Sequence, residues 1–289
     1  MVQDLPPMPQ VVSKIIQIGE NNITLSSDQL QSLIAVDPAL TSKILRIANS
    51  AFYARARKVS NLSEAITLLG FKTIKSLTLL VSTSDLFKKS KSNKNLIKEL
   101  WMRSVLTALI GKIIAEKSGN QTIKDEVFMA GLLKNIGQML LLNKYPAIYN
   151  EIFKQSGYGV DLKKLDQLEK KEFQINSMEI SALAMKQWNF PENLIEISEY
   201  CFDKFEQAKK SRNLLIVITL TGELVVLCKD LTGQGNISED AKEQLLEKFS
   251  QFADELSLKK VTRDYLLEGV VDLVHEDEFF TFCEELFSM

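Results

Sequence analysis

Two polar residues, Lys134 and Asn135, interrupt an otherwise apolar stretch, GLLKNIGQMLL, at residues 131–141. The apolar residues on both sides predict that this stretch lies in the middle of a core. An ammonium group and an amide in such a place are able to line a polar cleft that holds an anion or a nucleotide. The favoured interpretation is that both side chains hydrogen-bond locally and that Lys134 extends to solvent. If the pair takes part in chemistry, the chain is an enzyme; if the pair is left from lost chemistry, the chain does something else.

The sequence contains a single histidine, His275, followed by Glu276, Asp277 and Glu278. A metal ligand with acidic neighbours is one interpretation, and a solvated helix end is the favoured one. Because one imidazole cannot build a histidine-rich centre, an active site based on several histidines is excluded.

Carboxylates offer another route to a metal site. Asp125 with Glu126, or Glu169 with Glu172, would supply the oxygen ligands that Mg²⁺ and Mn²⁺ prefer. We interpret these acids as ordinary solvated helix turns, because their spacing indicates no designed pair. A residual metal-dependent phosphohydrolase is therefore the less favoured hypothesis. The sequence also lacks a P-loop and a GxSxG motif, and we expect no cofactor.

The charge balance argues against nucleic acid as a partner. The net charge is -2, with 35 basic and 37 acidic residues, whereas phosphate binding favours a basic excess. Residues 62–81 contain a helix, Gly70 and a second helix, which is the order of a helix-turn-helix motif. Core packing is the better interpretation, since an apolar run follows the few polar residues of the second helix. Those polar residues are Lys72, Thr73, Lys75 and Ser76.

Three widely spaced cysteines, Cys201, Cys228 and Cys283, indicate reduced thiols rather than a disulfide scaffold. The first residues, MVQDLPPMPQVV, do not read as a signal peptide. The longest apolar segment, residues 214–228, contains Glu223 and is too short to cross a membrane. We therefore expect a soluble, cytoplasmic protein with no membrane partner.

Apolar residues recur at three- and four-residue steps, which predicts helices throughout the chain. Helix caps are predicted from Ser26, from Asp37 followed by Pro38, and from Asn61 with Glu64. No segment reads as a strand, and residues 213–227 are predicted to form a buried helix. The predicted fold class is all-α.

The segment KKSKSNKNLIK, residues 88–98, is the clearest break in composition and is predicted to be a linker. We expect an N-terminal helical subdomain at 1–87 and a second helical domain at 99–205. A further helical region at 206–289 is expected to pack on this second domain.

Several motifs occur in an order that resembles one protein family. They are LPPMPQVVSKIIQI, VDPALTSKILRIANSAFY, VSNLSEAITLLGFKTIKSLTL, ELWMRSVLTALIGKIIAE, VFMAGLLKNIGQMLLL and MKQWNFPENLIEI. From about residue 5 to about residue 205 the chain resembles the HDOD family, the HD-related output domain of bacterial signalling proteins. The resemblance continues weakly to the end.

The resemblance implies a relationship to HD-domain phosphohydrolases, whose histidines and central His-Asp pair bind a divalent metal. In this chain the His-Asp pair would fall on Lys134 and Asn135, so the metal ligands are missing. The other ligand positions would fall on Ser104, near Ser177, and near Tyr200 and Cys201. The resemblance therefore implies a degenerate HD domain with a vacated metal site and no catalysis.

We expect a stand-alone, non-enzymatic regulatory protein that acts in bacterial signal transduction through contacts with other signalling proteins. The N-terminal bundle would move against the HD-like half about the linker. Candidate contact residues are Phe52, Tyr53, Phe279 and Phe280. A nucleotide second messenger, such as a cyclic dinucleotide, bound in the vacated cleft is the alternative.

Overall fold

The computed structural model describes residues 7–20, 26–50, 58–84, 87, 94–117, 120, 122–157, 162–200, 212–227 and 247 of the 289-residue chain. Within this part the regular elements are helices and no β-strand occurs, so the predicted all-α fold is confirmed. No helix of the described part has both the length and the apolar character needed to cross a bilayer.

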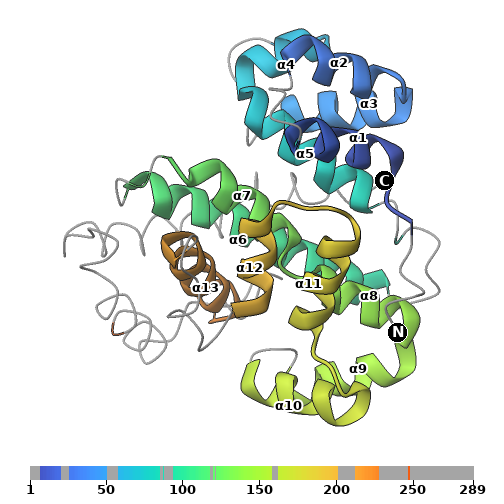
Figure 1. Cartoon of the computed structure of the whole chain (residues 1–289), viewed down its shortest axis with the longest axis vertical. Coiled ribbons are helices and arrows are strands. Elements are labelled where there is room, and N and C mark those ends of the chain that lie inside the picture. Colours follow the sequence, from blue (N-terminus) through green and yellow to red (C-terminus); the bar gives the residue numbers. More distant parts are fainter. Residues whose placement is uncertain are drawn as a thin grey trace.

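Five helices form a bundle in the N-terminal part of the chain (Figure 1). They are α1 (Gln10–Glu20), α2 (Ser27–Ala35), α3 (Pro38–Ala48), α4 (Leu62–Leu69) and α5 (Phe71–Ser84). Helix α5 packs against α1, α3 and α4 and is the centre of the bundle. Ile15, Leu30, Ile44 and Ile74, from four of the helices, are fully buried. Their burial removes apolar surface from water and holds the short helices together.

The predicted helix caps form in this bundle. Ser26 Oγ accepts a hydrogen bond from Gln29 N at 3.2 Å, and Asp37 Oδ1 accepts from Leu40 N at 3.1 Å. Asn61 Oδ1 accepts from Glu64 N at 2.9 Å. In a capping box the Glu64 carboxylate would also accept a hydrogen bond from the backbone amide of Asn61. Here it accepts from the backbone amide of Ser60 instead, so this part of the prediction is wrong. Each cap satisfies backbone donors that the first turn of a helix leaves unpaired.

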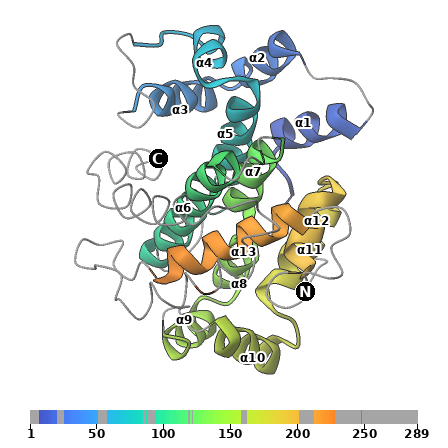
Figure 2. The ribbon, with the colours of Figure 1, turned by 90° about the vertical axis from the view of Figure 1, so that its left-hand side faces the viewer.

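The second half of the molecule is built around the long helix α6 (Lys94–Lys117) (Figures 1 and 2). It continues with α7 (Lys124–Leu133), α8 (Ile136–Lys144), α9 (Pro146–Gln155), α10 (Leu162–Phe173), α11 (Ser177–Gln187), α12 (Glu192–Tyr200) and α13 (Arg212–Leu227). Helices α7 and α13 pack against α6, and α11 packs against α8 and α12. Figure 2 shows α13 lying beside α6. This helix matches the one predicted over residues 213–227.

The two halves meet where α5 packs against α7. Lys72 Nζ on α5 lies 3.2 Å from Asp125 Oδ2 on α7. Thr73 and Ser76, also on α5, are buried, so these two side chains cannot reach base edges. This burial agrees with core packing rather than DNA binding as the interpretation of residues 62–81.

The predicted linker is wrong for residues 94–98, which form the start of α6. Leu96 and Leu100 are buried on one face of this helix. Apolar residues four apart thus outweigh the lysine and asparagine content that suggested a connector. The divisions of the chain at residues 87 and 205 stay predictions.

Several predicted residues lie outside the described part of the chain. They are Phe52, Tyr53, Cys201, His275, Phe279 and Phe280.

Candidate functional site

The corner between α7 and α8 holds Lys134 and Asn135. The apolar residues on either side, including Leu133 and Ile136, are buried as predicted. Asn135 is also buried, and its Nδ2 donates to Ser104 Oγ at 3.1 Å and to Leu100 O at 3.3 Å. Ser104 Oγ itself donates to Leu100 O at 3.1 Å. Two predicted site positions, Ser104 and Asn135, are therefore brought together and bond to each other.

Lys134 points from this corner toward α13. Its Nζ donates to Ile218 O at 3.3 Å. Gly222 makes room for the ammonium group, because a Cβ atom built there would lie 1.8 Å from Lys134 Nζ. The expectation that Lys134 extends to solvent is therefore wrong: the side chain joins the α7–α8 corner to a helix 84 residues further along the chain.

A close approach between α8 and α11 brings Ser177 to the same region. Gly137 N donates to Ser181 Oγ at 2.9 Å, and a Cβ at Gly137 would lie 1.8 Å from Ser177 O. Only glycine leaves enough room for this contact. Ser177 is the first residue of α11, and Asn176 caps this helix by accepting from Glu179 N at 2.8 Å.

Glu169 is a site residue that our sequence interpretation missed. We expected a solvated helix turn, but Glu169 is only 1% exposed. Its Oε1 accepts from the hydroxyl of Tyr149 at 2.6 Å, and its Oε2 accepts from Ser177 N at 2.7 Å. The cluster links α9, α10 and α11. A signal was present in the sequence, because Leu165 lies four residues earlier on the same face of the helix and is buried.

Burial dominates the electrostatics of this cluster. Desolvation raises the pKa of Glu169, although the hydrogen bonds from Tyr149 and Ser177 oppose the shift. Desolvation, together with the neighbouring Glu169 charge, raises the pKa of Tyr149 well above its ordinary value. Tyr149 therefore stays a neutral hydrogen-bond donor at physiological pH.

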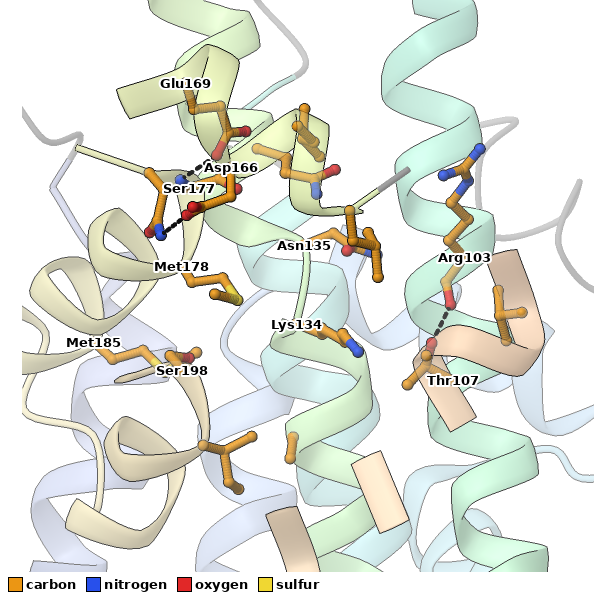
Figure 3. A pocket seen from close by; sticks show the side chains of 18 of the residues that line it. Arg103, Thr107, Lys134, Asn135, Asp166, Glu169, Ser177, Met178, Met185 and Ser198 are labelled. Carbon is orange, nitrogen blue, oxygen red and sulfur yellow. Dashed lines mark hydrogen bonds between the residues drawn. The ribbon is translucent and has the colours of Figure 1, made fainter. Parts of the chain in front are cut away.

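A cavity with a volume of about 50 Å³ opens between these helices (Figure 3). Lys134, Asn135 and Ser177, three of the positions considered for a polar cleft, line it, whereas Ser104 is hydrogen-bonded to Asn135 and is not among the lining residues. Its other polar lining residues are Arg103, Thr107, Gln138, Asp166, Glu169, Asn176 and Ser198. Leucine, isoleucine, methionine, valine and alanine side chains, together with Gly222, complete the wall. Tyr200 is the last residue of α12, and its predicted place with the other site residues stays a prediction.

The other proposed carboxylates lie elsewhere. Asp125 pairs with Lys72, and Glu126 accepts from Asn193 Nδ2 at 3.0 Å. Neither residue lines the cavity. Glu172 is exposed on α10. The acids that we weighed as metal ligands are therefore not brought together.

The α7–α8 corner does not suit a divalent metal. Asn135 turns its amide donors toward Ser104 and Leu100 O, and Lys134 adds a positive charge. Divalent cations are held by carboxylates, carbonyls and neutral imidazoles. Among the described residues, no three His, Cys, Asp or Glu side chains gather in a way that could hold an ion.

Comparison with known sequences places this arrangement in context. A family model described as the HDOD domain matches residues 5–202. An uncharacterised protein from Treponema pallidum is 25% identical over 195 residues, which cover 67% of this chain. The match spans 37% of that protein's length.

Solved structures share the fold over nearly the whole chain. An HDOD domain protein of unknown function from Geobacter sulfurreducens has a TM-score of 0.76 at 24% identity, covering 99% of this chain and 94% of its own. A protein named as a candidate phosphohydrolase from Shewanella amazonensis has a TM-score of 0.75 at 21% identity, covering 99% and 96%. A candidate signal-transduction protein from Marinobacter aquaeolei has a TM-score of 0.74 at 20% identity, covering 99% and 60%.

Proposed function

The chain belongs to the HDOD domain family, and from this premise we propose that it is a non-catalytic regulatory protein of bacterial signal transduction. It acts in the cytoplasm through contacts with other signalling proteins. The observation that carries the proposal is the α7–α8 corner, where Lys134 and Asn135 bond to groups of the chain itself.

The chemistry of this corner supports a regulatory function over hydrolysis. A phosphohydrolase of the metal-dependent type needs an ion that lowers the pKa of its bound water. Here a fixed ammonium group, that of Lys134, would repel such an ion. The hydrogen bonds of Asn135 to Ser104 and to Leu100 O orient the N–H donors of its amide toward α6. These residues stabilise the helical frame without supplying ligands.

The names of the structural relatives indicate two different functions. The Marinobacter protein is named for signal transduction and the Shewanella protein for phosphohydrolysis. The proposal follows the first of these because of the residues at the corner.

Metal content and hydrolysis test the non-catalytic part of the proposal together. Purified protein would be incubated with Mn²⁺, desalted and analysed by mass spectrometry, and then assayed with phosphomonoester and phosphodiester substrates. We expect far less than one ion per chain and no Mn²⁺-dependent hydrolysis. Stoichiometric metal with hydrolysis would overturn the proposal in favour of a residual phosphohydrolase.

Capture of partners from the native cell tests the regulatory part. The tagged full chain would be cross-linked in cells at several growth stages, and co-purified proteins would be identified by mass spectrometry. We expect at least one reproducible signalling protein. The absence of a reproducible partner at every growth stage would contradict action through protein contacts.

A nucleotide sensor is the second candidate, and the cationic side chains Arg103 and Lys134 on the cavity wall favour it. The volume of the cavity opposes it. Sites for ligands of this size measure roughly 300–1,000 Å³, and the cavity measures about 50 Å³. A cyclic dinucleotide would enter only if the helices moved apart, so nucleotides serve as test ligands in the experiment below.

A further inference from the structure

The cavity carries charges of opposite sign on different helices. Arg103 on α6 and Lys134 at the end of α7 are cationic, and Asp166 and Glu169 on α10 are acidic (Figure 3). Asp166 is already paired with Lys170, whose Nζ lies 3.0 Å from Asp166 Oδ1. Glu169, the other acid, forms no ion pair within the described residues.

Glu169 is held by neutral donors alone. Its hydrogen bonds come from the hydroxyl of Tyr149 and from Ser177 N, and no ion pair to it occurs within the described residues. Buried carboxylates are normally paired with a cation, since desolvation of an isolated charge is costly. Desolvation by burial raises the pKa of Glu169, and the nearby Asp166 charge adds to the shift. A carboxylate has about four acceptor sites, so these two bonds leave capacity for a further donor.

The part of the wall formed by α6 and the end of α7 is cationic, and its two charged side chains are held in place. The side chain of Arg103 is only 12% exposed and forms an ion pair with Glu99. Its Cζ lies over the ring of Phe153, 5.3 Å from the ring centroid. Lys134 is anchored by its bond to Ile218 O. A guanidinium offers five donors and an ammonium three, so each group can share a carboxylate ligand with the contacts it already makes.

The size and the remaining wall restrict the ligand further. A cavity of about 50 Å³ holds a few water molecules or a ligand of a few heavy atoms. Apolar side chains, including Leu165, Met185 and Ile197, line the remaining wall and suit a short apolar group. Gln138, which also lines the cavity, adds an amide donor and acceptor.

We propose that this cavity binds a small zwitterion, namely a free α-amino acid with a small apolar side chain. Its ammonium group donates to Glu169, and its carboxylate accepts from Arg103 and Lys134. The short side chain faces the apolar wall. In this pose one ligand places a positive charge beside Glu169 and a negative charge beside Arg103 and Lys134.

This inference goes beyond the proposed function and is tested separately from it. Its failure would leave the expected metal content, hydrolysis and partner results unchanged. Its success would give the regulatory protein a small-molecule input.

Isothermal titration calorimetry of the full chain with glycine, alanine and valine tests the inference directly. Acetate and methylammonium serve as half-ligands that carry one charge each, and inorganic phosphate and GMP test the other ligand classes. We expect saturable binding of at least one amino acid and at least tenfold weaker binding of both half-ligands, because each lacks one charge-assisted contact, worth about tenfold or more in affinity. No binding of any amino acid, or equal binding of acetate or phosphate, would overturn the proposal. GMP as the preferred ligand would replace it with the nucleotide sensor.

Matched variants assign the two walls. Glu169→Gln and Lys134→Met should each weaken amino-acid binding by about tenfold or more. Glu172→Gln and Lys163→Met, both at exposed positions of α10, should leave it unchanged. Circular dichroism would verify that each variant folds. If Glu169→Gln or Lys134→Met does not fold, the half-ligand comparison on the unmodified chain decides. Unchanged affinity in both folded cavity variants would show that the ligand binds elsewhere.

Discussion

At the scale of single residues, Glu169 is the side chain with the most unusual surroundings. It is a carboxyl group in the core, held by Tyr149 and Ser177 N, with no cationic partner in the described part of the chain. Desolvation raises its pKa above the ordinary value of 4.5. The folded chain therefore binds this proton more tightly than the unfolded chain does.

The stability of the chain should depend on pH through this residue. The stabilising effect of the bound proton is fully present below the unfolded-state pKa of Glu169 and is lost as the pH rises through its raised folded-state pKa. Glu169→Gln does not ionise, so the free energy of unfolding of the original chain should fall relative to the variant as the pH rises. Urea denaturation at a series of pH values above 4 would measure the difference.

Glu172→Gln is the matched control for this prediction, because Glu172 is exposed on the same helix. Its difference from the original chain should stay constant over the same pH range. A constant difference for Glu169→Gln as well would contradict the assignment of a raised pKa to Glu169.

The roles of single residues were predictable only where they depend on neighbours in sequence. The caps at Ser26, Asp37 and Asn61 follow from bonds spanning two or three residues. The contact of Tyr149 with Glu169 spans 20 residues, so the local sequence does not reveal this hydrogen bond, although the spacing from Leu165 indicates that Glu169 lies on the buried face. The site positions at Lys134 and Asn135 were recognised because the surrounding apolar pattern resembles a family. Their actual partners depend on tertiary packing.

At the scale of helices, the contact of α8 with α11 depends on Gly137. A methyl group there would meet Ser177 O at 1.8 Å, and this atom belongs to the backbone and cannot turn aside. We expect Gly137→Ala to lower the free energy of unfolding by about 3 kcal/mol or more, because the two helices must separate. Urea denaturation followed by circular dichroism would measure the loss.

Gly222→Ala is an informative comparison, because the same 1.8 Å separation there involves Lys134 Nζ, the end of a flexible side chain. Lys134 can rotate away and lose its bond to Ile218 O, while alanine favours the helix more than glycine does. The two effects are similar in size, so we expect a loss of about 1 kcal/mol or less. Equal losses at Gly137 and Gly222 would contradict this account of the two contacts.

Asn49, at the end of α3, is hydrogen-bonded to Leu45 and Val59. Its Nδ2 donates to Leu45 O and to Val59 O, each at 2.8 Å, and its Oδ1 accepts from Val59 N at 2.8 Å. We expect Asn49→Ala to lower the free energy of unfolding by about 2 kcal/mol, because it removes all three bonds.

Asn49→Asp tests the two hydrogen bonds that Asn49 donates separately from the one that it accepts. Aspartate keeps an oxygen for Val59 N but cannot donate to Leu45 O or Val59 O. Its loss of stability should differ from that of Asn49→Ala, and thermal unfolding of both variants would compare them. A negligible loss for Asn49→Ala would contradict a stabilising role of these hydrogen bonds.

At the scale of the whole molecule, the two halves are joined through α5 and α7. The ion pair at this junction, Lys72 with Asp125, has side chains that are 65% and 20% exposed. Water and salt weaken such a pair, so its coupling energy should be about 0.2–1 kcal/mol. A double-mutant cycle with Lys72→Ala and Asp125→Ala would measure it. A coupling above about 2 kcal/mol would show that the ion pair, rather than apolar packing, holds the halves together.

The overall architecture was more predictable than the boundaries within it. Apolar residues at helical spacing predicted an all-α chain, including α13, because this pattern is local and repeated. The start of α6 was missed, since lysine and asparagine between residues 88 and 98 obscured the apolar face of Leu96 and Leu100. Which helix packs on which depends on contacts far apart in the chain, such as that of Lys134 with Ile218 O.

That last contact also sets an order of events during synthesis of the chain. Ile218 leaves the ribosome 84 residues after Lys134, which corresponds to roughly 4–17 s at about 5–20 residues per second. The N-terminal bundle has all of its helices by then, whereas the apolar surface of α6 that later faces α13 has no cover. A nascent chain of this protein therefore exposes that surface to ribosome-associated chaperones for several seconds before α13 arrives.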